Sequence, residues 1–80
     1  MKYVYIIKSL ENPDQYYTGV TDNIEQRLNE HNTGKSPHTS KFRPWEIVVY
    51  TAFHDENKAF EFEKYLKSGS GRAFASKHFK

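Results

Sequence analysis

The sequence predicts a small α+β domain, with a three-stranded antiparallel sheet flanked by helices in the order β-β-α-β-α-α. Eighty residues leave room for one domain, which we expect to span residues 1–80. Aromatic residues make up 16% of the chain, so a thin core can form from bulky rings and disorder is not expected. Strand-like and helix-like segments alternate over this short length, which favours a mixed, layered fold.

The first two predicted strands form a hairpin. Residues 3–7 are all β-branched or aromatic, and residues 16–21 are again rich in Tyr, Thr and Val, which is typical of strands. Between them, Asn12, Pro13 and Asp14 have the chemistry of a turn, because proline fixes its φ angle and Asn or Asp bonds its own backbone. Two strands joined by such a turn are expected to pair with each other.

A helix is predicted to follow the hairpin. Ile24, Leu28 and His31 recur at the spacing of one helix face. Thr21 or Asp22 precedes them and can act as the N-cap, because its side-chain oxygen can accept a hydrogen bond from the first turn.

The end of this helix leads through a loop to the third strand. Gly34 can take a positive φ angle and so ends the helix. Residues 34–44 are polar and contain two prolines, which predicts a loop. Residues 45–53 are the strongest strand candidate in the chain because apolar, β-branched and aromatic residues dominate them.

Two further helices complete the predicted order. The second runs over residues 54–68, the Ser-Gly-Ser-Gly segment at 68–71 breaks it, and residues 72–80 form a short last helix. We interpret this segment as a helix stop and restart, with phosphate binding by its backbone N–H groups as the alternative. The residues expected near the inner face of the second helix are Ala59, Phe62 and Leu66, with Phe60 and Glu63 as further candidates.

Charge is distributed unevenly along the chain. Residues 1–63 hold all ten acidic residues and seven Lys or Arg, whereas residues 64–80 hold five Lys or Arg and no acid. A polyanionic partner or a solvated basic helix face would each explain this asymmetry.

Several protein classes are excluded by composition. The chain has no cysteine, so disulfides, zinc–thiolate sites and thiol catalysis are ruled out. The longest apolar run is Ile47-Val48-Val49, too short to span a membrane, and residues 1–8 lack the features of a signal peptide. We therefore expect a cytoplasmic domain with no membrane partner.

Several polar side chains are candidates for chemistry. Tyr5 and Tyr17 lie on the two strands of the hairpin, and Gly19 follows two residues after Tyr17. Arg27 and His31 are four apart, so they project from one helix face. A further candidate, placed among aromatic residues on the second helix, is Glu63.

Together these residues resemble the GIY-YIG nuclease domain. Tyr3-Val4-Tyr5 corresponds to the Gly-Ile-Tyr motif and Tyr17-Thr18-Gly19 to the Tyr-Ile-Gly motif. Arg27, followed by His31, stands at the family's spacing, and Glu63 corresponds to its later glutamate. The resemblance covers nearly the whole chain. Within the family, the chain is most similar to the short, single-domain bacterial members.

The resemblance implies a catalytic set of Tyr5, Tyr17, Arg27, His31 and Glu63. It implies one divalent cation, Mg²⁺ or Mn²⁺, on Glu63, because hard cations prefer oxygen ligands. Arg27 would hold the scissile phosphate, and Tyr5 or Tyr17 would orient or deprotonate the attacking water. His31 would carry a proton or hold a phosphate oxygen, and Gly19 would let the backbone approach the phosphate.

The implied partner is DNA, branched or damaged substrates included, with RNA left open. The residues expected to contact nucleic acid are Gly19, Lys35, Lys41, Arg43, Lys67, Arg72 and Lys77, together with Lys80. The chain departs from the family in having Tyr3 for the first glycine and Val20 where many members have lysine, and in lacking an asparagine after the glutamate.

Three functions follow from these observations: an endonuclease, a nucleic-acid-binding module with weak or no catalysis, and a protein-interaction domain. Ordinary structural roles stand beside the catalytic ones. The two tyrosines can pack across the hairpin, and Arg27 can face solvent. His31 can interact with the helix dipole, and Glu63 can pair with Lys67 one turn later.

Overall fold

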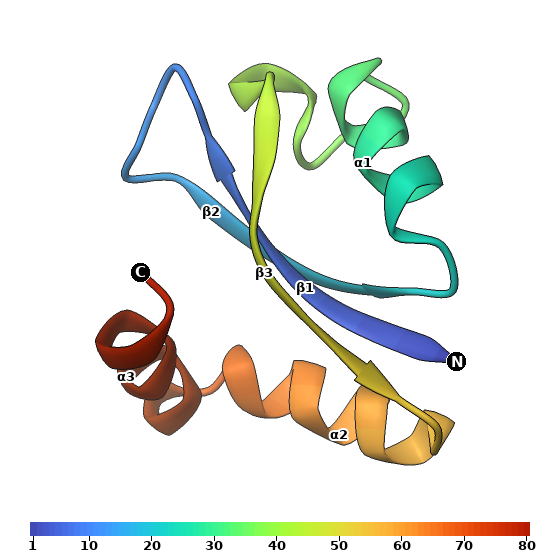
Figure 1. Ribbon diagram of the computed structural model, residues 1–80. Helices are drawn as coiled ribbons and strands as arrows, with labels where there is room; N and C mark the ends of the chain where they lie inside the picture. Colours follow the sequence, from blue (N-terminus) through green and yellow to red (C-terminus); the bar gives the residue numbers. More distant parts are fainter.

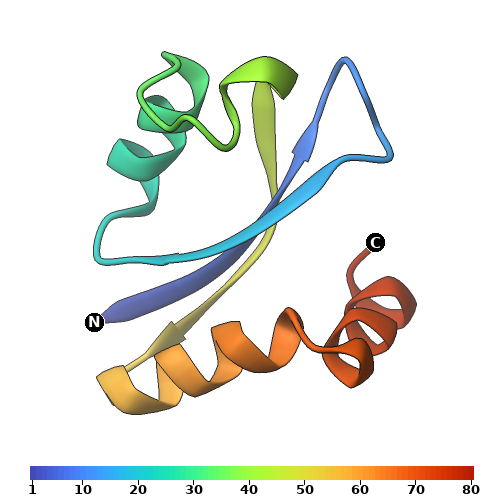
Figure 2. The ribbon, with the colours of Figure 1, turned by 180° about the vertical axis from the view of Figure 1, so that it is seen from behind.

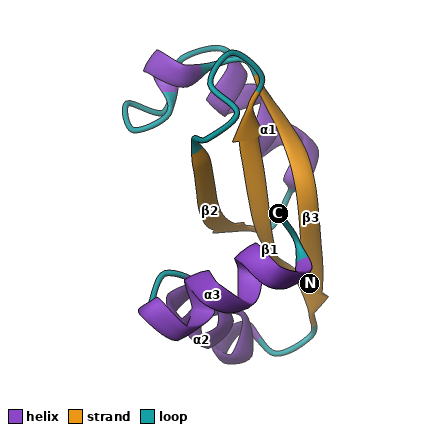
Figure 3. Cartoon of the chain, turned by 90° about the vertical axis from the view of Figure 1, so that its left-hand side faces the viewer, coloured by secondary structure: helices purple, strands orange, loops and turns teal.

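A computed structural model describes all of residues 1–80. Its one sheet is antiparallel and contains β1 (Lys2–Ser9), β2 (Tyr16–Thr21) and β3 (Trp45–Phe53), in the order β2-β1-β3. Figure 3 shows β1 between the other two strands, so β2 and β3 are the edges. The helices are α1 (Ile24–Asn32), α2 (Glu56–Leu66) and α3 (Gly69–His78). The predicted α+β class and β-β-α-β-α-α order are confirmed.

The sheet separates two layers of helices. Helix α1 lies on one face and α2 and α3 lie on the other (Figures 1 and 2). Because side chains alternate along a strand, β1 contributes to both layers. Val4 and Ile6 pack with α2 and α3, whereas Tyr5 and Ile7 pack with Trp45 under α1. The central strand is accordingly the most deeply buried element of the chain.

Helix α1 begins one residue later than it would with Asp22 as its N-cap and two later than with Thr21. Its N-cap is Asn23, whose side chain accepts a hydrogen bond from the backbone N–H of Gln26 at 3.0 Å. The predicted cap Asp22 instead forms an ion pair with Lys2 at 2.8 Å. The end of the helix is as predicted, because Gly34 has a φ angle of 81°. A three-residue helix, η1 (Ser40–Phe42), lies in the segment predicted to be only loop.

The junction between α2 and α3 is shorter than predicted. Helix α2 ends at Leu66, and α3 begins at Gly69 because the hydroxyl of Ser68 caps it by accepting from the N–H of Gly71 at 3.2 Å. The Ser-Gly-Ser-Gly segment is therefore mostly the first turn of α3. Phe60 is 44% exposed, so it does not lie on the inner face of α2. No helix in the structure combines the length and apolarity needed to cross a membrane.

Replacing Gly71 with alanine is expected to destabilise the domain, although alanine normally favours a helix by about 1 kcal/mol. A Cβ atom at Gly71 would lie 2.7 Å from Cα of Leu66 and would collide with the backbone of Tyr65. To relieve this collision, α3 must move away from α2, and we expect that movement to lower the unfolding free energy by about 3 kcal/mol. Gly69 has no atom within 4 Å of such a Cβ, so Gly69→Ala is the matched control and is expected to be neutral or stabilising. Urea denaturation of both variants measures the difference.

Candidate active site

Tyr5 occupies the centre of the candidate site, buried on the α1 face of the sheet. It pairs with Gly19 across the β1–β2 ladder and is 2% exposed. A Cβ atom at Gly19 would stand 2.6 Å from Cζ of Tyr5, too close for two carbon atoms. The missing side chain therefore provides the space that the hydroxyl end of Tyr5 fills. This reason for the glycine differs from the approach to a phosphate, which stays a prediction.

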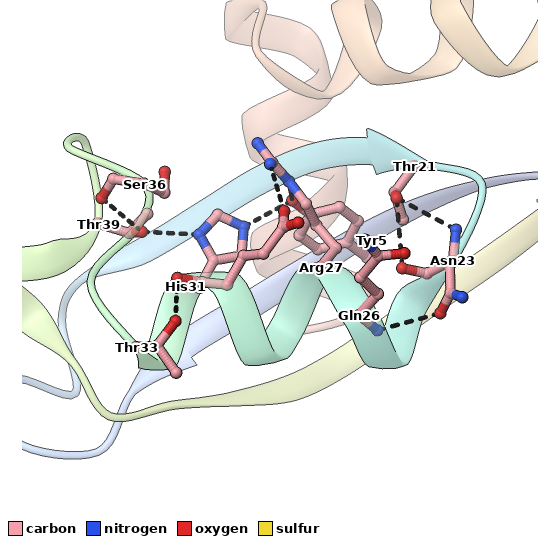
Figure 4. A network of polar contacts seen from close by, with 10 residues as sticks. Tyr5, Thr21, Asn23, Gln26, Arg27, His31, Thr33, Ser36 and Thr39 are labelled. Carbon is pink, nitrogen blue, oxygen red and sulfur yellow. Dashed lines mark hydrogen bonds and ion pairs between the residues drawn. The ribbon is translucent and has the colours of Figure 1, made fainter.

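His31 and Arg27 reach the Tyr5 hydroxyl from α1. His31 is fully buried, and its Nε2 lies 2.7 Å from that hydroxyl. Arg27 donates from Nε to the same oxygen at 3.4 Å (Figure 4). Its Nη1 is paired with Glu30 at 3.0 Å, and its side chain is 37% exposed. Since burial leaves no ring atom of His31 open to a phosphate, the geometry supports the proton-carrying role over the phosphate-holding one.

Burial dominates the ionisation of this pair. It raises the pKa of Tyr5, and the hydrogen bond and charge of Arg27 oppose the rise only in part. Burial, followed by the charge of Arg27, lowers the pKa of His31, and the nearby Glu30 opposes this. Near neutral pH the site holds a neutral phenol beside a neutral imidazole. Both shifts favour this neutral pair, so the imidazole accepts the phenol's proton only against them, as a transient step before the phenolate acts as a base.

Tyr17 joins the cluster from β2 in a different way. Its ring centroid lies 5.1 Å from that of His31 and 6.5 Å from that of Tyr5. Tyr17 is only half-buried and lines a surface groove. Tyr17 is therefore the tyrosine open to a ligand, whereas Tyr5 is the one connected to a base.

Glu63 approaches from the other side of the sheet. It lies on α2, where its side chain is 18% exposed and forms an ion pair with Lys67 at 2.6 Å. Lys67 also places its ammonium 5.8 Å from the ring centroid of Tyr17. The Glu63–Lys67 ion pair, which was one of the roles considered for Glu63 from the sequence, is therefore present. Through Lys67 it connects Glu63 to Tyr17 around the edge of β2.

The five predicted catalytic residues thus form two groups rather than one. Tyr17, Arg27 and His31 each lie against Tyr5 on the α1 face, and Glu63 lies on the α2 face. No single hollow is lined by all five, since Arg27 lines one of about 320 Å³ and Tyr17 another of about 400 Å³. Because β2 is an edge strand, both faces are accessible along its outer side. A ligand contacting all five would have to lie across that edge.

The donor atoms present limit how a metal ion could bind. No group of three or more His, Asp or Glu residues is placed to hold one. Mg²⁺, however, is commonly bound through one or two carboxylates, with waters and substrate phosphates completing its shell. Glu63 fits a site of that kind, in which the protein supplies one carboxylate, but it does not fit a cage made by the protein alone.

The basic residues predicted to contact nucleic acid are divided between two regions. Lys67 and Arg72 lie with Lys80 along the groove of about 400 Å³ between β2 and the C-terminal helices. The ammonium of Lys80 lies 4.4 Å from the ring centroid of Tyr16 in this groove. Lys77 is exposed on α3 outside it. Lys35, Lys41 and Arg43 are exposed in the segment between α1 and β3 and do not line this groove.

Thr39 belongs to the site but was not predicted from the sequence. It is 1% exposed, and its Oγ1 lies 2.7 Å from Nδ1 of His31. It lies in an irregular segment, where no periodicity relates it to His31. Only the fold brings the two together, and the sequence carries no signal that would have identified the contact.

The lowered pKa of His31 predicts that stability falls in mild acid. Below about pH 6.5 the unfolded chain binds a proton at this residue that the folded chain does not bind. The unfolding free energy is expected to drop by up to about 1.4 kcal/mol per pH unit, until the pH reaches the lowered folded-state pKa. Urea denaturation at a series of pH values between about 7.5 and 5 measures this change in unfolding free energy. His31→Gln should show a smaller slope, whereas the exposed control His38→Gln should retain it.

Comparison with known proteins places these residues in context. A family model described as the GIY-YIG catalytic domain matches residues 1–77. The structure-specific endonuclease subunit SLX1 of Debaryomyces hansenii is 39% identical over 72 residues, which are 80% of this chain and 20% of that protein. A UPF0213 protein of Staphylococcus haemolyticus is 38% identical over 69 residues, covering 85% of this chain and 82% of the relative.

A solved structure has the same fold. The solution NMR structure of a UPF0213 protein from Bacillus halodurans matches with a TM-score of 0.56 and 27% identity. The match covers 96% of this chain and 84% of that one. The chain therefore spans only a fifth of the SLX1 subunit but most of each UPF0213 protein.

Proposed function

The chain belongs to the GIY-YIG catalytic domain family, and from this premise we propose that it is a metal-dependent endonuclease that hydrolyses phosphodiester bonds in DNA. The observation that carries the proposal is the hydrogen-bonded group of Tyr5, His31 and Arg27. It joins a proton donor, a proton acceptor and a phosphate-binding cation within one contact network.

Arg27 is the phosphate ligand in this proposal. A guanidinium is a planar fork of N–H donors that matches two phosphate oxygens. Its charge also stabilises the negative charge that grows on those oxygens during hydrolysis. Because Nε of Arg27 lies 3.4 Å from the Tyr5 hydroxyl, a phosphate bound to Arg27 comes close to that hydroxyl.

Tyr5 and His31 together remove a proton from the attacking water. Tyr5 transfers its phenolic proton to Nε2 of His31, and the resulting phenolate takes a proton from the attacking water. Arg27 favours the phenolate because it is a fixed positive charge beside it. Tyr17, the more accessible tyrosine, orients the water or the phosphate on the open side of the cluster.

Glu63 is the residue that would hold the divalent cation, Mg²⁺ or Mn²⁺. When bound, such a cation supplies positive charge for the phosphoryl and leaving oxygens. Lys67, which neutralises Glu63 in the free protein, would then be released to contact a phosphate.

DNA is the proposed substrate, and branched DNA is the first to test. One relative is named a structure-specific endonuclease subunit, which supports a choice of DNA by shape. The groove beside Tyr17 supports the binding of one strand, because it carries three cations and only one acid, Asp14. Contacts of this kind position a backbone without reading its sequence.

Removing two cations from the groove is expected to weaken DNA binding. For the double variant Arg72→Gln, Lys80→Gln, the slope of log affinity against log salt concentration should fall by about 2, since each phosphate contact contributes about 0.9. The double variant Lys58→Gln, Lys64→Gln is the matched control, because it removes the same charge from exposed residues of α2 outside the groove. Fluorescence anisotropy over a range of salt concentrations measures both. Equal losses in the two proteins would contradict binding in the groove.

A cleavage panel tests the proposed function. Purified protein is incubated with supercoiled plasmid, branched duplex, linear duplex, single-stranded DNA and RNA, each with Mg²⁺, Mn²⁺ or a chelator. We expect nicking of at least one DNA substrate that requires a divalent cation. Cleavage that continues in the chelator, or that acts on RNA alone, would contradict the proposal.

A second candidate is a nucleic-acid-binding module without useful catalysis. The observation that favours it is the close ion pair between Glu63 and Lys67, together with the absence of any group of three or more His, Asp or Glu residues placed to hold a metal ion. This candidate predicts salt-dependent binding without nicking by any metal. Its Glu63→Ala variant should bind DNA at least as well as the natural chain, because a negative charge is removed.

A further inference from the structure

A chain of four hydrogen bonds passes through the buried imidazole of His31 (Figure 4). It runs from Nε of Arg27 to the Tyr5 hydroxyl at 3.4 Å and from there to Nε2 of His31 at 2.7 Å. It continues from Nδ1 of His31 to Oγ1 of Thr39 at 2.7 Å, and then to the backbone carbonyl of Ser36 at 3.5 Å. The chain therefore joins β1, α1 and the segment before η1.

The two ends of this chain determine its direction. The Arg27 guanidinium can only donate, and the Ser36 carbonyl can only accept. Each hydroxyl between them has one proton, so Thr39 gives its proton to Ser36 and must accept from His31. At the other end, Tyr5 accepts from Arg27 and gives its own proton to His31.

The opposite direction would leave bonds unmade. If Nε2 of His31 carried the proton, the Tyr5 hydroxyl would receive two donors and its own proton would have no acceptor in the chain. Thr39 would have to donate to Nδ1 and so give up its bond to Ser36. Buried polar groups are as a rule hydrogen-bonded, and only the first direction gives every proton in the chain an acceptor.

We propose that Thr39 is a positioning residue that keeps His31 in the Nδ1–H tautomer, so that Nε2 stays free to receive the proton of Tyr5. This inference rests on the proposed function, in which Tyr5 gives up that proton. The proton balance is complete: the Tyr5 O–H bond breaks, the Nε2–H bond forms, and Nδ1 keeps its hydrogen throughout. His31 becomes a cation whose two N–H groups donate to Tyr5 and Thr39.

The backbone around Thr39 is fixed by separate contacts. Its carbonyl accepts a hydrogen bond from Nε1 of the buried Trp45 at 2.9 Å, and its N–H donates to Ser36 at 3.2 Å. Trp45 is held in turn by Asn32, whose Oδ1 accepts from the Trp45 backbone N–H at 2.6 Å. The hydroxyl of Thr39 is therefore not needed to hold the segment in place, which leaves it free for the tautomer role.

The test compares the natural chain with Thr39→Val, which keeps the shape but loses the hydroxyl, and Thr39→Ser, which keeps the hydroxyl. Nitrogen NMR of the ¹⁵N-labelled imidazole, recorded without DNA, identifies which ring nitrogen carries the proton. We expect Nδ1–H in the natural chain and in Thr39→Ser, and a mixture of tautomers in Thr39→Val. Cleavage should fall about 10- to 100-fold in Thr39→Val at unchanged DNA affinity, by analogy with the partners that orient metal-binding histidines. Thr39→Ser should restore most of the rate.

The spectrum of the natural chain decides the inference even if Thr39→Val does not fold. An Nε2–H tautomer in that spectrum would overturn it, as would a folded Thr39→Val protein that keeps Nδ1–H entirely. If the tautomers behave as expected but no DNA is cut, the positioning role stands and the proposed endonuclease function fails.

Discussion

Replacing Glu63 with glutamine is expected to lower the rate of metal-dependent DNA cleavage by about 10³-fold or more. In the proposed function this carboxylate is the protein's ligand to the cation, and a cation at a phosphoryl group contributes several kcal/mol to the transition state. Glutamine keeps the size of the side chain but removes its charge. Single-turnover cleavage with saturating enzyme measures the change, and adding a chelator should slow the variant much less than it slows the natural chain.

Glu61→Gln is the matched control for this change. Glu61 lies on the same helix and is exposed, so its loss removes the same charge without reaching the site. We expect Glu61→Gln to retain the natural rate within about twofold and both variants to bind DNA at least as tightly as the natural chain. A Glu63→Gln protein that cuts as fast as Glu61→Gln would remove Glu63 from the mechanism.

Tyr5→Phe is expected to lower the cleavage rate by about 10²- to 10⁴-fold, the usual contribution of a general base. The change removes one oxygen, and with it the bonds to His31 and Arg27. It also leaves Nε2 of His31 without a donor, which costs about 1–3 kcal/mol of unfolding free energy. Cleavage must therefore be measured at a temperature where denaturation curves show the variant to be folded.

Tyr3→Phe provides the comparison because Tyr3 lies two residues earlier on the same face of β1. Its ring packs edge-on against Tyr50 at 5.8 Å, away from the hydrogen-bonded cluster. We expect Tyr3→Phe to cut at nearly the natural rate. Equal rates in Tyr3→Phe and a folded Tyr5→Phe would show that the Tyr5 hydroxyl takes no part in the reaction.

The strands could be predicted from the sequence because local composition determines them. Residues 45–53 are β-branched and aromatic, and β3 has those same bounds. The ends of the helices were harder to predict, because several neighbouring residues can cap a helix equally well. Asp22 is a good N-cap in isolation, but its ion pair with Lys2 on β1 leaves the cap to Asn23. Such competition depends on residues far apart in the sequence.

The sequence was enough to predict which residues belong to the candidate site, but not how all of them are arranged in space. Arg27 and His31 lie four apart on one helix, so their contact with a common partner follows from helix geometry. The sequence does not say which face of the sheet α2 covers, and so it could not place Glu63 across the edge of β2. Likewise, nothing in the pattern relates Thr39 to His31, because the loop that joins them has no period.

The most direct test of whether the two groups of residues form one nuclease site is the single-turnover cleavage rate of four proteins: the natural chain, Tyr5→Phe, Glu63→Gln and the double variant. Residues that act on one reaction as a unit have effects that do not add. We therefore expect each single variant to lose most of the metal-dependent rate, and the double variant to be no slower than the slower single one. Natural rates in both single variants, with DNA bound and the proteins folded, would contradict the proposed site.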